Sequence, residues 1–285
     1  MAGLSADFTE TVLESAVNEA FSAFDSCTCK GGRNTRKAQA EPHLCSLPFP
    51  TGRAPMNWEA LITTLELAAT TAVILAIVSL PLSYWIAFSK WRWKFAVEAV
   101  VALPLVLPPT VLGFYVLVAL GPRSPLGRWY EALAGHGLPF TFQGLVVASV
   151  LYSLPFAVQP IAAAFRSVDR KYIEASWMLG ASNLETFFRV IIPQSWAGMM
   201  TGIVLSFAHT LGEFGVVLMV GGNIPGVTRT LSIDIYDQVQ SLNYSAAAST
   251  SAVLLIISFV ILSIVYGLNR KVWFFAADRR HRQAV

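Results

Sequence analysis

Two ionisable side chains, His209 and Glu213, lie within the long apolar stretch "WAGMMTGIVLSFAHTLGEFGVVLMVGG". They are four residues apart, so a helix would place them on one face. An ionisable group inside a membrane costs a few kcal/mol, so each must face the other, a partner helix or a water-filled cavity. Two roles are possible for this pair. It could relay protons, as in a secondary carrier, or it could have a structural role that positions a gate. Gly212 and Gly215 beside it indicate close helix contact or local flexibility.

A second pattern is the charged stretch "EASWMLGASNLETFFRVIIP" between two apolar runs. Asp169 is an N-cap for a helix of about three turns, which Gly180 ends. Ser182 and Glu185 then form a capping box, so a second short helix starts there and Pro193 ends it. Connections within bundles are usually roughly 2–8 residues long. This longer helix-turn-helix, with apolar residues rimmed by charge, predicts a rigid contact for another protein.

The composition indicates the elements that position these residues. Of the 285 residues, 55% are hydrophobic and only 13% are charged, against about 25% charged in ordinary globular proteins. A membrane-spanning helix needs about 20 mostly apolar residues. The sequence therefore predicts an all-α integral membrane protein with five spans, at about 61–88, 95–120, 142–165, 196–221 and 246–268.

The second predicted span contains three prolines, Pro104, Pro108 and Pro109. Each removes a backbone donor and disfavours helix at the residue before it, so this helix must be broken or kinked. Transporters place broken helices beside the substrate path, although a packed kink without a transport role is the alternative. The candidates for a translocation path or gate are therefore Pro108, Pro109, Thr110, His209, Thr210 and Glu213.

The distribution of Lys and Arg predicts the orientation. Beyond residue 55, twelve of these residues lie in one set of connections and three in the opposite set. By the positive-inside rule, the charged stretch and the C-terminus are cytoplasmic, and the first of five helices starts outside. The two sets are Lys90, Arg92, Lys94, Arg166, Arg170, Lys171, Arg189, Arg270, Lys271, Arg279, Arg280 and Arg282, against Arg123, Arg128 and Arg229.

Residues 1–55 differ from the predicted membrane-spanning part of the chain. They are more polar and contain all three cysteines, Cys27, Cys29 and Cys45. They show no signal-peptide pattern and no further ligands at zinc spacing, so no metal site is expected. We interpret them as a disordered tail or as the result of a start codon assigned too far upstream, with Met56 as the natural first residue. Residues 56–270 then form the membrane domain, with a loop at about 166–195, and 271–285 a basic tail.

The charged stretch resembles the EAA loop of ABC importer permeases, whose pattern is E-A-A-x3-G-x9-I-x-L-P. The spacing matches throughout, with Ser176, Val190 and Ile192 as small departures. The resemblance implies the fold of type I importer permeases, in which this loop docks on the ATP-binding subunit. The residues that would form the coupling loop are Glu174, Ala175, Ser176, Gly180, Ser182, Glu185, Val190, Ile192 and Pro193.

Three further segments, "LPPTVLGFY", "SWMLGAS" and "TLGEFGVVLMVGGNIPGVTRTLSIDIY", resemble the ModB-type permeases of molybdate importers, a group that also serves sulfate and tungstate. The resemblance implies an inner-membrane subunit, without an enzymatic activity of its own, that works with an extracytoplasmic oxyanion-binding protein. That protein would dock near Asn223, Pro225, Gly226 and Arg229.

No G-x-x-x-x-G-K-[ST] phosphate loop occurs in the sequence, so ATP and Mg²⁺ are expected on a separate ATPase subunit and no cofactor in this chain. One coupling loop per chain implies a second permease chain, most simply in a two-fold homodimer. No nucleic-acid partner is expected. Three alternatives stay open: the same architecture for sulfate or tungstate, a proton-coupled secondary carrier built on His209 and Glu213, and a membrane scaffold that transports nothing.

Overall fold

The structure, a computed structural model, describes residues 57–282, with side chains as far as residue 263. The predicted tail at 1–55 lies outside this part of the chain. Every regular element between residues 57 and 282 is helical. In chain order these are α2 (Trp58–Phe88), α3 (Lys94–Val106), α4 (Pro109–Leu120), α5 (Pro125–Ala134), α6 (Phe142–Arg166), α7 (Arg170–Met178), α8 (Asn183–Thr186), the π-helix η1 (Phe187–Ile191), α9 (Ile192–Leu211), α10 (Gly215–Gly221), α11 (Leu231–Gln240) and α12 (Tyr244–Arg282).

Four helical stretches in the described part are long and apolar enough to cross a membrane: Trp58–Phe88, Phe142–Arg166, Asn183–Leu211 and Tyr244–Ser263. A fifth crossing exists if α3 and α4, which meet at an angle of 114°, count as one broken span. The predicted all-α bundle of about five spans is therefore confirmed. The backbone of α12 continues as helix beyond its apolar part, to Arg282.

The break between α3 and α4 lies at Leu107 and Pro108, which are both extended, with ψ angles of 137° and 136°. Each of them precedes a proline, and a residue in that position avoids the helical region. Pro109 then occupies the first position of α4, where a missing N–H is harmless. The predicted interruption is confirmed at Pro108 and Pro109, whereas Pro104 is accommodated inside α3.

The helix of the fourth predicted span, 196–221, is not continuous in the structure. Helix α9 stops at Leu211, and three residues separate it from α10. At the other end, Pro193 does not end the preceding helix, because η1 joins α8 to α9 without a gap. The amide of Ile192 donates to the carbonyl of Phe187, five residues back. This wider turn relieves the clash between a proline ring and the preceding turn, so the helix continues.

Helix α6 lies at the centre of the core, in contact with both α2 and α9. Its residues Leu145, Ile161 and Phe165 are fully buried. Gly202 allows α9 to approach it closely, since a Cβ atom there would lie 2.7 Å from the carbonyl oxygen of Ala157. Gly198, one turn earlier, faces Ala164 in the same way. These small residues bring the two backbones together, as in other membrane helix pairs.

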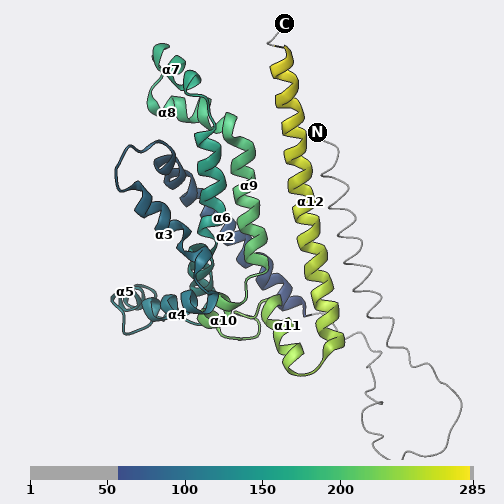
Figure 1. Cartoon of the computed structure of the whole chain (residues 1–285). Coiled ribbons are helices and arrows are strands. Elements are labelled where there is room, and N and C mark those ends of the chain that lie inside the picture. Colours follow the sequence, from purple (N-terminus) through teal and green to yellow (C-terminus); the bar gives the residue numbers. More distant parts are fainter. Residues whose placement is uncertain (1–56, 283–285) are drawn as a thin grey trace, which may run out of the picture. The chain divides into compact units, whose positions relative to one another are not determined.

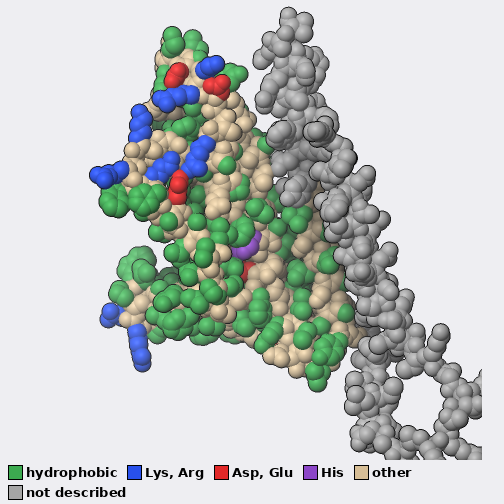
Figure 2. Space-filling model, viewed as in Figure 1, with side chains coloured by type: hydrophobic (Ala, Val, Ile, Leu, Met, Phe, Trp, Pro, Cys, Tyr) green, Lys and Arg blue, Asp and Glu red, His purple; other side chains and the backbone are tan. Residues whose placement is uncertain are grey.

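The bundle has two chemically different ends. Helices α7 and α8 lie at one end, whereas α4, α5, α10 and α11 lie at the other (Figure 1). The first helix starts at the second end, where the Asn57 side chain donates to Asp234 of α11 over 3.1 Å. On the face shown in Figure 2, most Lys and Arg side chains gather at the α7 end. This arrangement agrees with the uneven distribution of cations in the sequence.

Candidate functional site

The helix-turn-helix predicted from the sequence is present, with its caps in place. Asp169 accepts from the amide of Lys171 at the start of α7. Gly180, with φ of +84°, ends α7, and Ala181 donates to the carbonyl of Ser176 over 3.0 Å. The capping box of Ser182 and Glu185 then starts α8, with both reciprocal hydrogen bonds formed.

A hydroxyl pair that the sequence did not reveal joins the two arms of this loop. The oxygen of Ser176 lies 2.7 Å from the carbonyl oxygen of Ile173 and 2.8 Å from the hydroxyl of Thr186. Thr186 is only 2% exposed, so this contact is shielded from water. The EAA pattern has alanine at the position of Ser176, and alanine could not form the hydrogen bond to Thr186. The departure from the pattern therefore fixes α7 to α8 in this chain.

One face of the loop is anchored to the bundle. Ile173 and Ile191 are buried in a cluster with Phe165 of α6. The Phe187 ring lies 5.0 Å from that of Tyr84 in α2 and 6.0 Å from that of Phe165. This close packing joins the loop to both α2 and α6.

The opposite face of the loop is exposed and apolar. Met178, Leu179 and Leu184 are 89%, 88% and 72% exposed. Ion pairs flank them, from Arg170 to Glu174 at 3.0 Å and from Arg189 to Glu185 at 3.7 Å. We call Met178, Leu179 and Leu184 the loop tip. Of the other motif residues, Ala175 and Pro193 are exposed, whereas Val190 and Ile192 are partly buried.

A cavity of about 610 Å³ opens where the two interrupted spans meet. It is lined by four of the six predicted path residues, Pro109, Thr110, His209 and Glu213. The start of α10 lies close to the start of α4, because a Cβ atom at Gly215 would be 2.8 Å from that of Pro109. Pro108 and Thr210 do not line this cavity.

His209 and Glu213 do not share a helical face, contrary to the sequence-based prediction. The helix ends at Leu211, between them, so the i,i+4 geometry is lost. The Nδ1 atom of His209 lies 2.9 Å from the hydroxyl of Ser153, and its ring stacks on Phe156 with centroids 3.9 Å apart. The Ser153 hydroxyl also bonds that of Thr210, at 3.0 Å.

Glu213 is 4% exposed, yet neither of its carboxyl oxygens has a hydrogen bond of standard geometry to any described residue. The nearby Ser149 hydroxyl interacts with the carboxyl electrostatically, but it too lacks such a bond. Buried polar groups without partners are rare and costly, and they often mark functional positions. Thr110 and His209 line the cavity, and Glu213 lies at its edge with both carboxyl oxygens buried within the protein.

At the other end of the bundle, a polar network shapes the loop between α10 and α11. Asn223 donates to Asp237 and accepts from Nε of Arg229, and Arg229 also lies 3.4 Å from the Asp237 carboxylate. Pro225 and Gly226 are exposed at the tip of this loop. Asn223 and Arg229 are thus engaged within the chain. Asp237, which the sequence did not indicate, completes their network.

An apolar bundle with two interrupted spans around an internal cavity, and an anchored helix-turn-helix at one end, defines a multi-pass membrane transport protein. Sequence comparison identifies the family within this class. The chain belongs to the family described as binding-protein-dependent transport system inner membrane component, whose profile matches residues 79–274. The resemblance drawn from the EAA pattern is therefore confirmed.

Individual relatives agree with this assignment. The molybdenum transport system permease protein ModB of Azotobacter vinelandii is 49% identical over 211 residues, which cover 74% of this chain and 93% of that protein. A probable sulfate transport system permease protein, cysT of Chlorella vulgaris, is 30% identical over 74% of this chain and 79% of its own length. A bacterial alginate ABC transporter shares the fold, with a TM-score of 0.64 at 16% identity over 77% of this chain and 80% of that chain.

Proposed function

We propose that this chain is the membrane-spanning permease subunit of an ATP-binding-cassette importer that carries molybdate. The observation that carries this proposal is the 49% identity to the Azotobacter vinelandii molybdenum permease, over 93% of that protein. The relative named for sulfate is markedly more distant, at 30%. The mainly apolar cavity at the two interrupted spans, with Thr110 and His209 in its lining, supports a transport role rather than a scaffold.

The energy for transport comes from a separate ATP-binding subunit that grips the loop tip. The tip is apolar, exposed and flanked by ion pairs, as expected of a protein contact. Its anchored face would pass closure of the ATPase to α2 and α6, shifting the bundle between two states. ATP and Mg²⁺ bind the partner, since this sequence has no phosphate loop.

The loop end of the bundle faces the cytoplasm, and the first helix starts outside. The twelve-to-three distribution of cations supports this orientation. An oxyanion-binding protein would then dock at the outer end, where Pro225 and Gly226 are exposed. Asn223 and Arg229 hold that loop in shape. A second copy of the chain would complete a two-fold pair with one coupling loop for each ATPase.

The translocation path passes the cavity of Thr110, His209 and Glu213. Two of the spans that contribute to it are interrupted there, so their ends can move without breaking a continuous helix. The path is expected to be weakly selective, because the binding protein chooses the oxyanion. His209 is bonded to Ser153 rather than to Glu213, which gives a direct proton relay between them no support.

Proteoliposomes test this function. The chain is reconstituted with its ATP-binding subunit and its binding protein, and molybdate uptake is measured with and without ATP. We expect uptake that requires ATP, survives an uncoupler and is little reduced by a tenfold excess of sulfate. Efficient competition by sulfate would assign the sulfate alternative instead. Uptake that persists without ATP and collapses with an uncoupler would support the proton-coupled carrier.

A further inference from the structure

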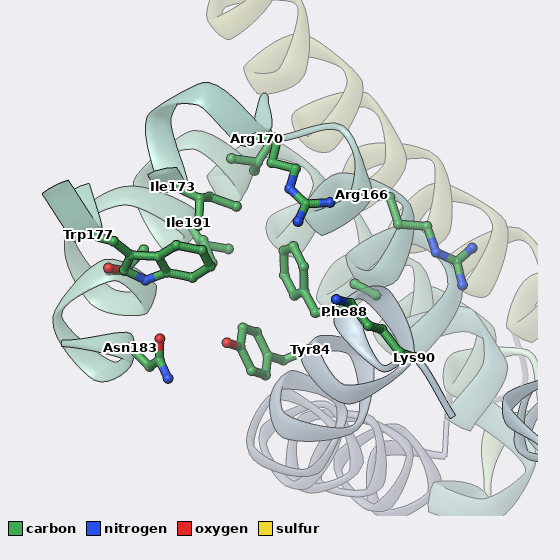
Figure 3. Close-up of a pocket in the computed structure, with 12 residues that line it drawn as sticks. Tyr84, Phe88, Lys90, Arg166, Arg170, Ile173, Trp177, Asn183 and Ile191 are labelled. Carbon is green, nitrogen blue, oxygen red and sulfur yellow. The ribbon is translucent and has the colours of Figure 1, made fainter. Parts of the chain in front are cut away.

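A second cavity, of about 570 Å³, lies between the end of α2 and the helix-turn-helix (Figure 3). Its volume is in the range of small-molecule binding sites. The twelve residues that line it include three cations, Lys90, Arg166 and Arg170, and no acid. Nothing in the proposed transport mechanism uses this cavity.

The charge of the cavity is only partly balanced by neighbouring carboxylates. Arg166 pairs with Glu98, and Arg170 pairs with Glu174 at 3.0 Å. Lys90 makes no ion pair with any described residue. In Figure 3 the side chains of Lys90 and Arg170 both point toward the space beside Phe88, whereas Arg166 points away from it. An anion placed there would meet two cationic groups from separate elements.

Aromatic side chains form another part of this wall. Tyr84, Phe88 and Trp177 line the cavity together with the cations. An inorganic oxyanion would gain little from such rings, because they offer apolar surface. An amphipathic anion would use both the cations and the rings.

The cavity also lies at the boundary of the membrane. The apolar stretch of α2 ends at Phe88, two residues before Lys90. The exposed side chains of Trp85, Trp91 and Trp93 surround this point in the sequence, and exposed tryptophans are typical of the headgroup level. Basic pockets at this level of membrane proteins bind anionic headgroups.

We propose that this cavity binds the phosphodiester headgroup of an anionic phospholipid, held by Lys90 and Arg170 against Tyr84 and Phe88. The lipid would bridge the end of α2 and the first turn of α7. It would thus add a contact between the bundle and the coupling loop, beyond the packing of Phe187 on Tyr84.

Lipid binding to the full-length purified chain tests this proposal. Native mass spectrometry in detergent follows the titration with phosphatidylglycerol of wild type, of the double variant Lys90→Gln with Arg170→Gln, and of Lys171→Gln. Lys171 is the matched control, since it adjoins Arg170 and does not line the cavity. One cation near an anionic headgroup contributes about fivefold in affinity, so the double variant should bind about 30-fold more weakly. The control should bind as wild type does.

A parallel titration with inorganic phosphate shows whether the cavity binds a lipid headgroup or a free phosphate ion. We expect phosphate at millimolar concentration neither to bind tightly nor to displace the lipid. Displacement at that concentration would assign the site to a free anion and overturn the lipid proposal. Equal lipid affinity in the double variant and the Lys171→Gln control would also overturn it, because the cavity cations would then make no contribution. Near-ultraviolet circular dichroism of each variant establishes that the fold is unchanged.

Discussion

The change Gly180→Pro is expected to leave the chain in the membrane and to abolish the stimulation of ATP hydrolysis by transport. Gly180 has φ of +84°, whereas proline holds φ near −65°. Proline also removes the amide that donates to the carbonyl of Trp177 over 2.9 Å. Together these changes oppose the native turn by about 2–3 kcal/mol. The two arms of the loop would no longer hold the loop tip in place.

A Cβ atom at Gly180 would meet nothing within 4 Å, so the expected effect comes from the backbone restrictions of proline rather than from contacts of that atom. Gly135 provides a matched control, because it also ends a helix with positive φ, 75°, and open space around it. It lies at the end of α5, away from the loop (Figure 1). ATPase activity of the reconstituted transporter is measured with and without loaded binding protein. Normal stimulation in Gly180→Pro, or equal loss in Gly135→Pro, would count against the coupling role.

The change Glu213→Leu is expected to raise the stability of the chain and to reduce molybdate uptake at least about tenfold. Leucine has a similar volume and removes a buried carboxyl group that makes no hydrogen bond of standard geometry to any described residue. Such a replacement stabilises a fold by about 1–3 kcal/mol. If Glu213 serves the path, however, the gain in stability comes with a loss of function. Thermal unfolding and uptake are measured on the same preparation.

A matched variant separates polarity from charge. Glu213→Gln keeps the shape and the hydrogen-bonding capacity, so we expect it to retain more uptake than Glu213→Leu. If Glu213 had only a structural role, the Glu213→Leu variant would be more stable and would keep full molybdate uptake. That outcome would remove Glu213 from the proposed path.

Features that depend on local hydrogen bonds were predictable from the sequence. The N-cap Asp169, the left-handed Gly180 and the capping box of Ser182 and Glu185 each involve residues a few positions apart, so their spacing alone identifies them. The break at Pro108 was predictable for the same reason, because proline restricts its own residue and the one before it.

Features that depend on packing were not predictable. The end of α9 at Leu211 separates His209 from Glu213, and its only local signal is the C-cap Gly212, a residue type that is also common inside membrane helices. The π-helix that carries the chain past Pro193 has no spacing signal in the sequence, where a proline normally indicates the end of a helix. The contact between Ser176 and Thr186 crosses two helices, so no spacing rule reveals it. The path and docking residues stay predictions until variants test them.

The most direct test of the central claim is copurification of the ATP-binding subunit with this chain. The chain carries an affinity tag, and wild type is compared with Leu184→Asp at the loop tip. Leu242→Asp is the control, because Leu242 is equally exposed, at 72%, and lies between α11 and α12. A contact residue at the centre of an interface contributes about tenfold or more to affinity. We therefore predict that wild type and Leu242→Asp retain the ATP-binding subunit and that Leu184→Asp loses it; equal retention by all three chains would contradict the coupling role of the loop.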